Sequence, residues 1–195
     1  MKQHAITALI AGFLNENPDM TLQTIEGDST FVKELLTDGK CDIAFLRSES
    51  SSVKEFNSIP YMIDYLTAVL PVTHPLAKAD NLPFEQLRGE TFLLFPEHSF
   101  INDLCIRECR NAGFEPHIAY TGNRGATLID LVRNGAGITL MMHHSARQEN
   151  DSSLAFIPVT PGIYSYISLN YAKEKPLSPQ AESFVRYVKA HKRDF

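Results

Sequence analysis

Two stretches of the chain repeat the same order of features, and this repeat limits the folds that the chain can adopt. Each begins with a glycine and a loop, continues with a helix-like segment, and ends with a second glycine and an apolar run. The two glycines are 12 residues apart in the first stretch (27 to 39) and 13 in the second (122 to 135). The stretches begin 95 residues apart (27 to 122). We therefore predict an α/β fold with two similar lobes instead of one continuous sheet.

Apolar spacing predicts further helices and strands along the chain. Residues spaced i, i+3, i+4 and i+7 predict helices that begin near Ile6, Ser29, Ser99, Gly125 and Ser178, with a short turn at Phe84–Leu87. Short apolar or alternating runs predict strands at Met20–Glu26, Cys41–Leu46, Ile59–Ile63, Leu66–Val72, Thr91–Phe95, His117–Tyr120, Ile138–Met142, Leu154–Val159 and Tyr164–Ala172. We expect Ser29 or Thr30 to cap the second helix. Such alternation is typical of parallel sheets covered by helices on both faces.

Charge and cysteine content exclude several classes of protein. The 18 Lys and Arg residues and 23 Asp and Glu residues give a net charge of −5. Nucleic-acid binding normally needs a basic face, so we do not expect this chain to bind DNA or RNA by itself. Three cysteines are too few for a disulfide scaffold and indicate a reducing, cytoplasmic location. No apolar run has the ~18 residues of a membrane span, so no membrane partner is expected.

The chain lacks the motifs of common enzymes and metal proteins. It contains no Gly-x-Ser-x-Gly, P-loop or His-Glu-x-x-His sequence, and its acidic residues form no convincing catalytic pair. Cys105 and Cys109 lie on one apolar helix face, which predicts core packing. The His143-His144 pair has no further ligand at metal-site spacing. We therefore predict a protein that is not an enzyme and needs no metal or other cofactor.

Four groups of residues, in their order along the chain, resemble a known family. They are Asn17-Pro18-Asp19 with Glu26-Gly27 and Leu35-Leu36-x-x-Gly39-x-x-Asp42-Ile43-Ala44-Phe45; His74-Pro75-Leu76-Ala77; Leu131-Val132-x-x-Gly135-x-Gly137-Ile138; and Leu177-Ser178-Pro179-x-Ala181-x-x-Phe184. Together they resemble the effector-binding domain of LysR-type transcriptional regulators. One departure is Met142, which stands where that family usually has a proline.

The resemblance implies a fold like that of type 2 periplasmic binding proteins, with two Rossmann-like lobes joined by two crossing strands. Residues 1–71 and 172–195 would form lobe I, and residues 72–171 would form lobe II. The chain begins almost directly with a helix where a strand should come first, so we interpret it as a fragment of a longer protein. The resemblance places an N-terminal winged helix–turn–helix outside this chain, and DNA would be bound only through it.

The resemblance also implies partners. A small-molecule effector would bind between the lobes, and the protein would be a homodimer or tetramer. In the dimer, the first helix and Met20–Glu26 of one subunit would lie against the Ser99–Ala112 helix region of the other. The alternatives are a solute-binding receptor of a transporter and a small-molecule binding domain without a regulatory role. An upstream helix–turn–helix would indicate a regulator, whereas an upstream signal peptide would indicate a receptor.

Candidate ligand contacts follow from the carboxyl ends of the predicted strands, where open α/β sheets bind their ligands. Helix N-termini there favour anions, and Arg47 after a buried strand can pair with a carboxylate. We therefore expect a small organic acid. The candidate residues are Met1, Ser29, Thr30, Arg47, His98, Ser99, Phe100, Asn123, Arg124 and Gly125.

Each candidate also has a simpler interpretation. The three hydroxyl residues are ordinary helix caps, and Phe100 is equally suited to the core. Arg47 can pair with Glu49 or Glu55, and Arg124 can face solvent. The sequence leaves these alternatives open.

Overall fold

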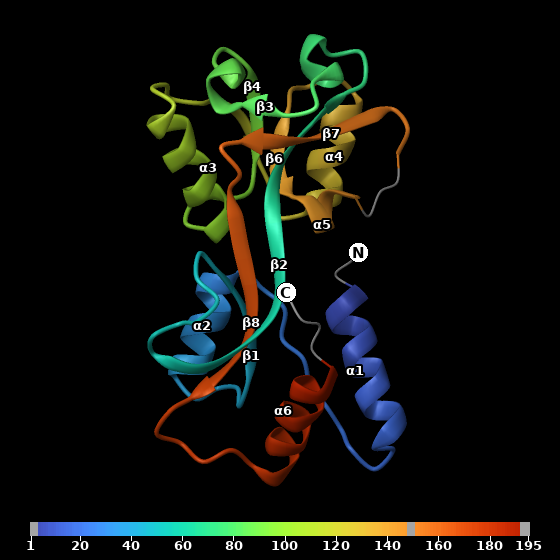
Figure 1. The fold of residues 1–195 in the computed structure, drawn as a ribbon, viewed down its shortest axis with the longest axis vertical. Coiled ribbons are helices and arrows are strands. Elements are labelled where there is room, and N and C mark those ends of the chain that lie inside the picture. Colours follow the sequence, from blue (N-terminus) through green and yellow to red (C-terminus); the bar gives the residue numbers. More distant parts are fainter. Residues whose placement is uncertain (1–3, 148–150, 192–195) are drawn as a thin grey trace. The chain divides into compact units, whose positions relative to one another are not determined.

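Two long strands, β2 (Phe56–Pro71) and β8 (Tyr164–Ala172), contain the points at which the chain passes between two compact units (Figure 1). The computed structural model describes residues 4–147 and 151–191. Residues 64–164 form the body of one compact unit, here the first unit. Residues 4–63 and 165–191 form the second unit. The predicted lobe boundaries at 71/72 and 171/172 stay a prediction.

The first unit contains two sets of paired strands. β2 pairs antiparallel with β6 (Thr139–Met142) and β7 (Leu154–Thr160), and β7 pairs parallel with β3 (Leu82–Pro83). β4 (Thr91–Leu94) pairs parallel with β5 (His117–Thr121). A parallel bridge from Phe92 to Ile138 joins β4 to β6. The expectation of parallel sheets is therefore only partly right, because β2 and β8 make antiparallel pairs.

Helices cover both sides of β4 in the first unit (Figure 1). Phe92 and Leu94 pack with Leu104, Cys105 and Cys109 of α3 (Phe100–Asn111). Leu93, on the opposite face of the strand, packs with α4 (Gly125–Arg133). The remaining short helices are η1 (Pro75–Lys78), η2 (Phe84–Leu87) and α5 (His143–Ala146).

Cys105 and Cys109 are both fully buried and free, as the sequence predicts. Burial raises the pKa of both thiols, to about 12 for Cys109.

The second unit consists of three helices around a small sheet. β1 (Ala44–Ser48) pairs antiparallel with β8. α1 (His4–Glu16) lies beside α6 (Pro179–His191), and the ring of Phe13 meets the edge of Phe184 at 5.0 Å (Figure 1). α2 (Ser29–Thr37) buries Leu36 against Ala44, Leu46 and Phe56.

Four sequence predictions about local structure need correction. Met20–Glu26 is not a strand, because no neighbouring strand forms a ladder with it, and its Ile25 is 51% exposed. Ile59–Ile63 and Leu66–Val72 are not separate strands but parts of the 16-residue β2, which continues through the buried polar Asp64. The cap of α2 is Asp28, whose carboxylate accepts from the Thr30 N–H at 2.8 Å. The predicted strand Cys41–Leu46 begins three residues later and ends two residues later, as Ala44–Ser48.

In the part of the chain that the structure covers, every helix is too short or too polar to cross a membrane.

Candidate functional site

In the second unit, Arg47 joins three elements. Its backbone N–H donates to the hydroxyl of Ser29 at 2.9 Å, and its Nη1 donates to Ser165 Oγ at 2.6 Å. Ser29 is the first residue of α2, Arg47 lies near the carboxyl end of β1, and Ser165 lies at the start of β8. This arrangement places a guanidinium and two hydroxyls at one end of the small sheet.

The start of α2 already has a negative partner. Asp28 caps the helix, and its main-chain carbonyl also accepts from the Val32 N–H at 2.9 Å. A carboxylate at a helix N-terminus satisfies the helix dipole and its N–H groups. The predicted anion site at Ser29 and Thr30 therefore depends on Arg47 for its positive charge, not on the helix end.

In the first unit, two predicted ligand loops lie at the same sheet edge. The turn after β4 contains His98 and Ser99, and the turn after β5 contains Asn123 and Arg124. Because β4 and β5 are parallel, their carboxyl ends coincide, and the Gly122 N–H donates to Leu94 O at 3.0 Å. This edge is where open α/β sheets bind ligands.

The turn after β4 is held by its own polar groups. Ser99 Oγ donates to Pro96 O at 2.7 Å and accepts from the Asn102 N–H at 3.3 Å. The buried Asn102 amide donates to Phe95 O at 2.8 Å. Ser99 is thus a true helix cap, which the sequence predicts. His98 is exposed and has a φ of 66°, an uncommon conformation for a residue with a side chain.

The start of α4 presents main-chain donors. The side chain of its N-cap residue, Arg124, makes no capping hydrogen bond, and the first N–H groups of any helix have no partner within the helix. Gly125 begins the helix, and a Cβ there would lie 2.8 Å from the side chain of Met141. The glycine therefore lets the start of α4 pack closely on β6.

The remaining candidates have less to offer a ligand. Phe100 is half-buried and packs against the core of the first unit, which favours its core interpretation. Met1 lies outside the described residues. Arg47, Ser29 and Thr30 belong to the second unit and the other described candidates to the first, so each group is described within its own unit.

Sequence reasoning missed a buried carboxylate in the first unit. Asp64 is fully buried, and its Oδ1 accepts from the main-chain N–H groups of Tyr65 and His144 at 2.9 and 3.1 Å. The Nδ1 of His144 lies 2.8 Å from the same oxygen. Asp64 and His144 are 80 residues apart, so spacing gives no signal of this pair.

His143 lies beside this pair and has its own partners. Its ring stacks on Tyr65 at 4.4 Å, and its Nδ1 lies 3.2 Å from Thr67 Oγ1. Burial lowers the pKa of His143, and the charge of Arg147 lowers it further. Over residues 4–147 and 151–191, no three potential metal ligands come together. The His143 imidazole packs on the Tyr65 ring and lies beside the Thr67 hydroxyl.

Comparison with known proteins gives a consistent set of relatives. The family model described as the LysR substrate binding domain matches residues 1–193. The transcriptional dual regulator GltC of Bacillus subtilis is 25% identical over 184 residues, which cover 94% of this chain and 61% of GltC. The regulator TtuA of Agrobacterium vitis is 30% identical over 147 residues, which cover 73% of this chain and 47% of TtuA. The chain thus spans less than two thirds of the length of these relatives.

Solved structures share the fold at lower identity. The regulatory domain of CcmR from Synechocystis PCC6803, in complex with 2-PG, has a TM-score of 0.88 at 16% identity and covers 98% of this chain and 93% of its own. The effector-binding domain of QuiR, in complex with shikimate, has a TM-score of 0.80 at 19% identity, covering 97% and 93%. The predicted periplasmic-binding-protein-like fold is confirmed.

Proposed function

The chain belongs to the LysR substrate-binding domain family, and we propose that it is the effector-sensing and oligomerisation domain of a LysR-type transcriptional regulator. It binds a small organic anion and so controls DNA binding by an N-terminal domain outside this chain. The matched relatives are transcriptional regulators, which favours this function over a transporter receptor or an enzyme. The expected location is the cytoplasm, where such a regulator meets DNA.

The observation that carries the proposal is the position of Arg47. Its guanidinium contacts Ser165 Oγ, a neutral acceptor, at 2.6 Å. A carboxylate makes charge-assisted, bidentate hydrogen bonds to arginine that are about twice as strong as bonds to a neutral group. A small carboxylate would therefore bind Arg47 more strongly than the Ser165 hydroxyl does, with Ser29 and Thr30 as neighbouring hydroxyls.

The first unit has its own group of candidate contacts. The start of α4 offers main-chain N–H groups at Gly125, and Asn123, Arg124, His98 and Ser99 surround the same sheet edge. Donors of this kind suit the oxygens of an organic acid. Two structural neighbours are bound to small ligands, 2-PG in CcmR and the carboxylic acid shikimate in QuiR, which supports an acidic effector here.

Effector binding would act as a shift between two conformations. A ligand changes such an equilibrium only by its difference in affinity for the two states. The effector must therefore hold one arrangement of the domain more tightly than the other, and this arrangement would determine how paired subunits hold their DNA-binding domains.

In the proposed dimer, α1 and residues 20–26 of one subunit lie against the Ser99–Ala112 region of the other. Residues 20–26 are extended without a ladder, and Ile25 is 51% exposed. All five residues of β5, which follows the α3 region, are exposed, including Ile118 and Tyr120. Another subunit would cover these surfaces. Sedimentation should show a dimer or tetramer at micromolar concentration, and a monomer throughout would contradict this arrangement.

A thermal-shift screen tests the sensing function. Small carboxylates, amino acids and inorganic anions are added to the chain, and a ligand at about one hundred times its Kd should stabilise it by ~2.7 kcal/mol. The shift should disappear in Arg47→Ala. The matched control is Arg186→Ala, which removes an exposed arginine of α6 in the same unit. A carboxylate that stabilises Arg47→Ala as strongly as the original chain would contradict the proposal.

A further inference from the structure

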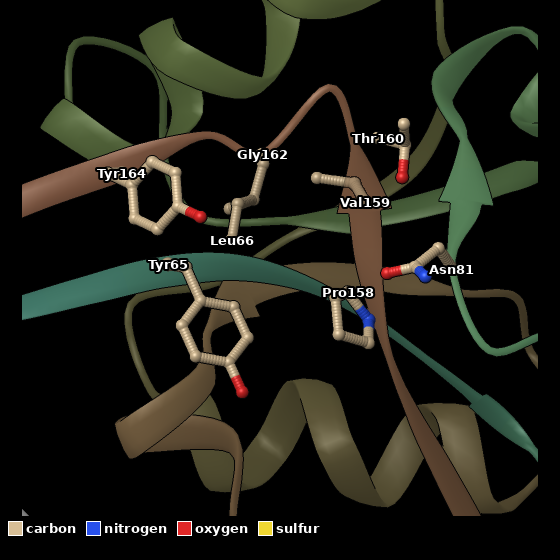
Figure 2. A pocket seen from close by; sticks show the side chains of 8 residues that line it. All are labelled: Tyr65, Leu66, Asn81, Pro158, Val159, Thr160, Gly162 and Tyr164. Atoms are coloured by element: carbon tan, nitrogen blue, oxygen red, sulfur yellow. The ribbon is translucent and has the colours of Figure 1, made fainter.

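The first unit contains a pocket that none of the candidate effector residues lines. Its volume is about 330 Å³, and its walls come from β2, β7 and the segments that flank β3 and β8 (Figure 2). The chain passes from the second unit to the first between residues 63 and 64 and returns between 164 and 165. Tyr65 and Tyr164, at these two passages, both line the pocket. One occupant would therefore contact both connecting segments within the first unit.

Two tyrosines line the pocket, and their rings point in different directions: the Tyr164 ring lies at the pocket, whereas the Tyr65 ring lies on the other side of β2 (Figure 2). The Tyr65 ring is held in place by its stacking on His143, with 4.4 Å between the ring centroids. Tyr164 is 57% exposed, which makes it the most exposed of the large hydrophobic residues in the described part of the chain. An aromatic ring on the surface of a pocket is available to stack on a planar ligand.

The turn before β8 is shaped to keep the Tyr164 ring at the pocket. A Cβ on Gly162 would lie 3.0 Å from Tyr164 Cε2 and 3.1 Å from its hydroxyl oxygen. The glycine therefore leaves room for this ring to lie across the turn. Beneath it, the Leu66 N–H donates to Ile163 O at 2.8 Å, and this hydrogen bond fixes the two connecting segments to each other.

The opposite side of the pocket is polar but uncharged. Figure 2 shows Asn81 and Thr160 across the pocket from Tyr164, with the apolar side chains of Leu66 and Val159 between. An amide and a hydroxyl together donate and accept hydrogen bonds. None of the lining residues is charged, so a ligand with a carboxylate would lose hydration here without gaining a cation.

We propose that this pocket is a second ligand site of the domain, for a neutral aromatic ring that carries an amide or hydroxyl group. The ring stacks on Tyr164, and its polar substituent binds Asn81 and Thr160. The site is separate from the proposed anion site. It takes a neutral ligand, whereas the anion site takes a carboxylate. Failure of one proposal therefore leaves the other intact.

Benzamide and benzoate form a matched pair of probes, because they have the same shape and differ in charge. The 15N-labelled chain is titrated with each while main-chain amide NMR shifts are recorded. Benzamide should shift the amides of Tyr65, Asn81 and Gly162, whereas benzoate at the same concentration should not shift them. Benzoate serves at the same time as a probe of Arg47, whose amide lies in the other unit.

Substitution of one ring tests the stacking contact. Tyr164→Ala should weaken benzamide binding roughly two- to tenfold, the range of an aromatic pair. Tyr120→Ala removes a tyrosine of β5 that is 39% exposed and does not line the pocket, and it should leave binding unchanged. Because Tyr164 is mostly exposed, its removal should not unfold the unit.

Three results would overturn the site. They are no shift of the pocket amides up to the solubility of benzamide, equal shifts with benzoate, and equal benzamide affinity of the Tyr164→Ala and Tyr120→Ala variants.

Discussion

Gly137 is the residue whose substitution tests the packing of the first unit most sharply. It precedes β6 with a φ of 154°, and a Cβ built on it would lie 2.4 Å from the main-chain oxygen of Thr91. An ordinary contact needs at least 3.4 Å, so β4 and β6 would have to separate by about 1 Å. Two hydrogen bonds connect the strands there, from the Ile138 N–H to Thr91 O at 2.8 Å and from the Leu93 N–H to Ile138 O at 2.9 Å.

The expected cost of Gly137→Ala follows from these contacts. An alanine in an unfavourable positive-φ conformation costs about 1–2 kcal/mol, and the loss of two hydrogen bonds adds about 1 kcal/mol each. The sum is about 3–4 kcal/mol of unfolding free energy. Gly135→Ala is the matched control, because Gly135 has a φ of 76° but no atom within 4 Å of an added Cβ. It should cost only the conformational part.

Urea unfolding followed by circular dichroism measures both variants, with free energies from linear extrapolation. Gly137→Ala should be less stable than Gly135→Ala by about 2 kcal/mol. Hydrogen exchange should assign the loss to residues 64–164. Equal stabilities of the two variants would refute the contact between β4 and the turn before β6.

Three further predictions concern buried and ionisable groups. A thiol reagent at pH 8 should modify the half-buried Cys41 first. Burial raises the pKa of Cys105 and Cys109 more than that of Cys41 and closes both to solvent. Fast labelling of all three thiols in the folded chain would contradict this packing. Asp64→Ala should lower the unfolding free energy by roughly 2–4 kcal/mol, because it leaves two buried N–H groups and His144 without their acceptor. Urea unfolding measures this loss. A loss under ~0.5 kcal/mol would mean that Asp64 is not their acceptor. Hydrogen bonds from Ser153 and then Arg133 lower the pKa of Asp151 from 3.8 to about 2. Its stabilising effect should therefore be complete above about pH 4 and disappear as the pH falls through about 2. Asp151→Asn and the original chain should differ in stability at pH 6 and converge below about pH 2, and a constant difference would contradict the assignment.

Local signals made much of the fold predictable. Ser99 and Ser178 cap their helices as expected, and Gly39, Gly113 and Gly135 end helices with positive φ. These features depend on residues within one turn of each other, so the sequence carries them directly. The helix stripe of Cys105 and Cys109 was predictable for the same reason.

Features that depend on distant partners were not predictable. Met20–Glu26 has the composition of a strand, but a strand needs a neighbour, and none pairs with it in the described chain. In the sequence, Asp64 in the middle of β2 resembles a break between two strands. Its partner His144 comes 80 residues later, so the local sequence does not show that the carboxylate is buried and paired. The sequence indicated Arg47 as a candidate, but its contact with Ser165 joins residues 118 positions apart.

The central claim is that Arg47 binds the carboxylate of an effector. Its most direct test is calorimetric titration of a carboxylate that stabilises the chain, into the original protein, Arg47→Ala, Arg47→Lys and Arg186→Ala. Loss of a hydrogen-bonded charge pair of about 1.5–3 kcal/mol predicts an affinity at least tenfold weaker in Arg47→Ala. Arg47→Lys should recover only part of the affinity, because lysine cannot bind bidentately. Equal affinities in all four proteins would contradict the claim.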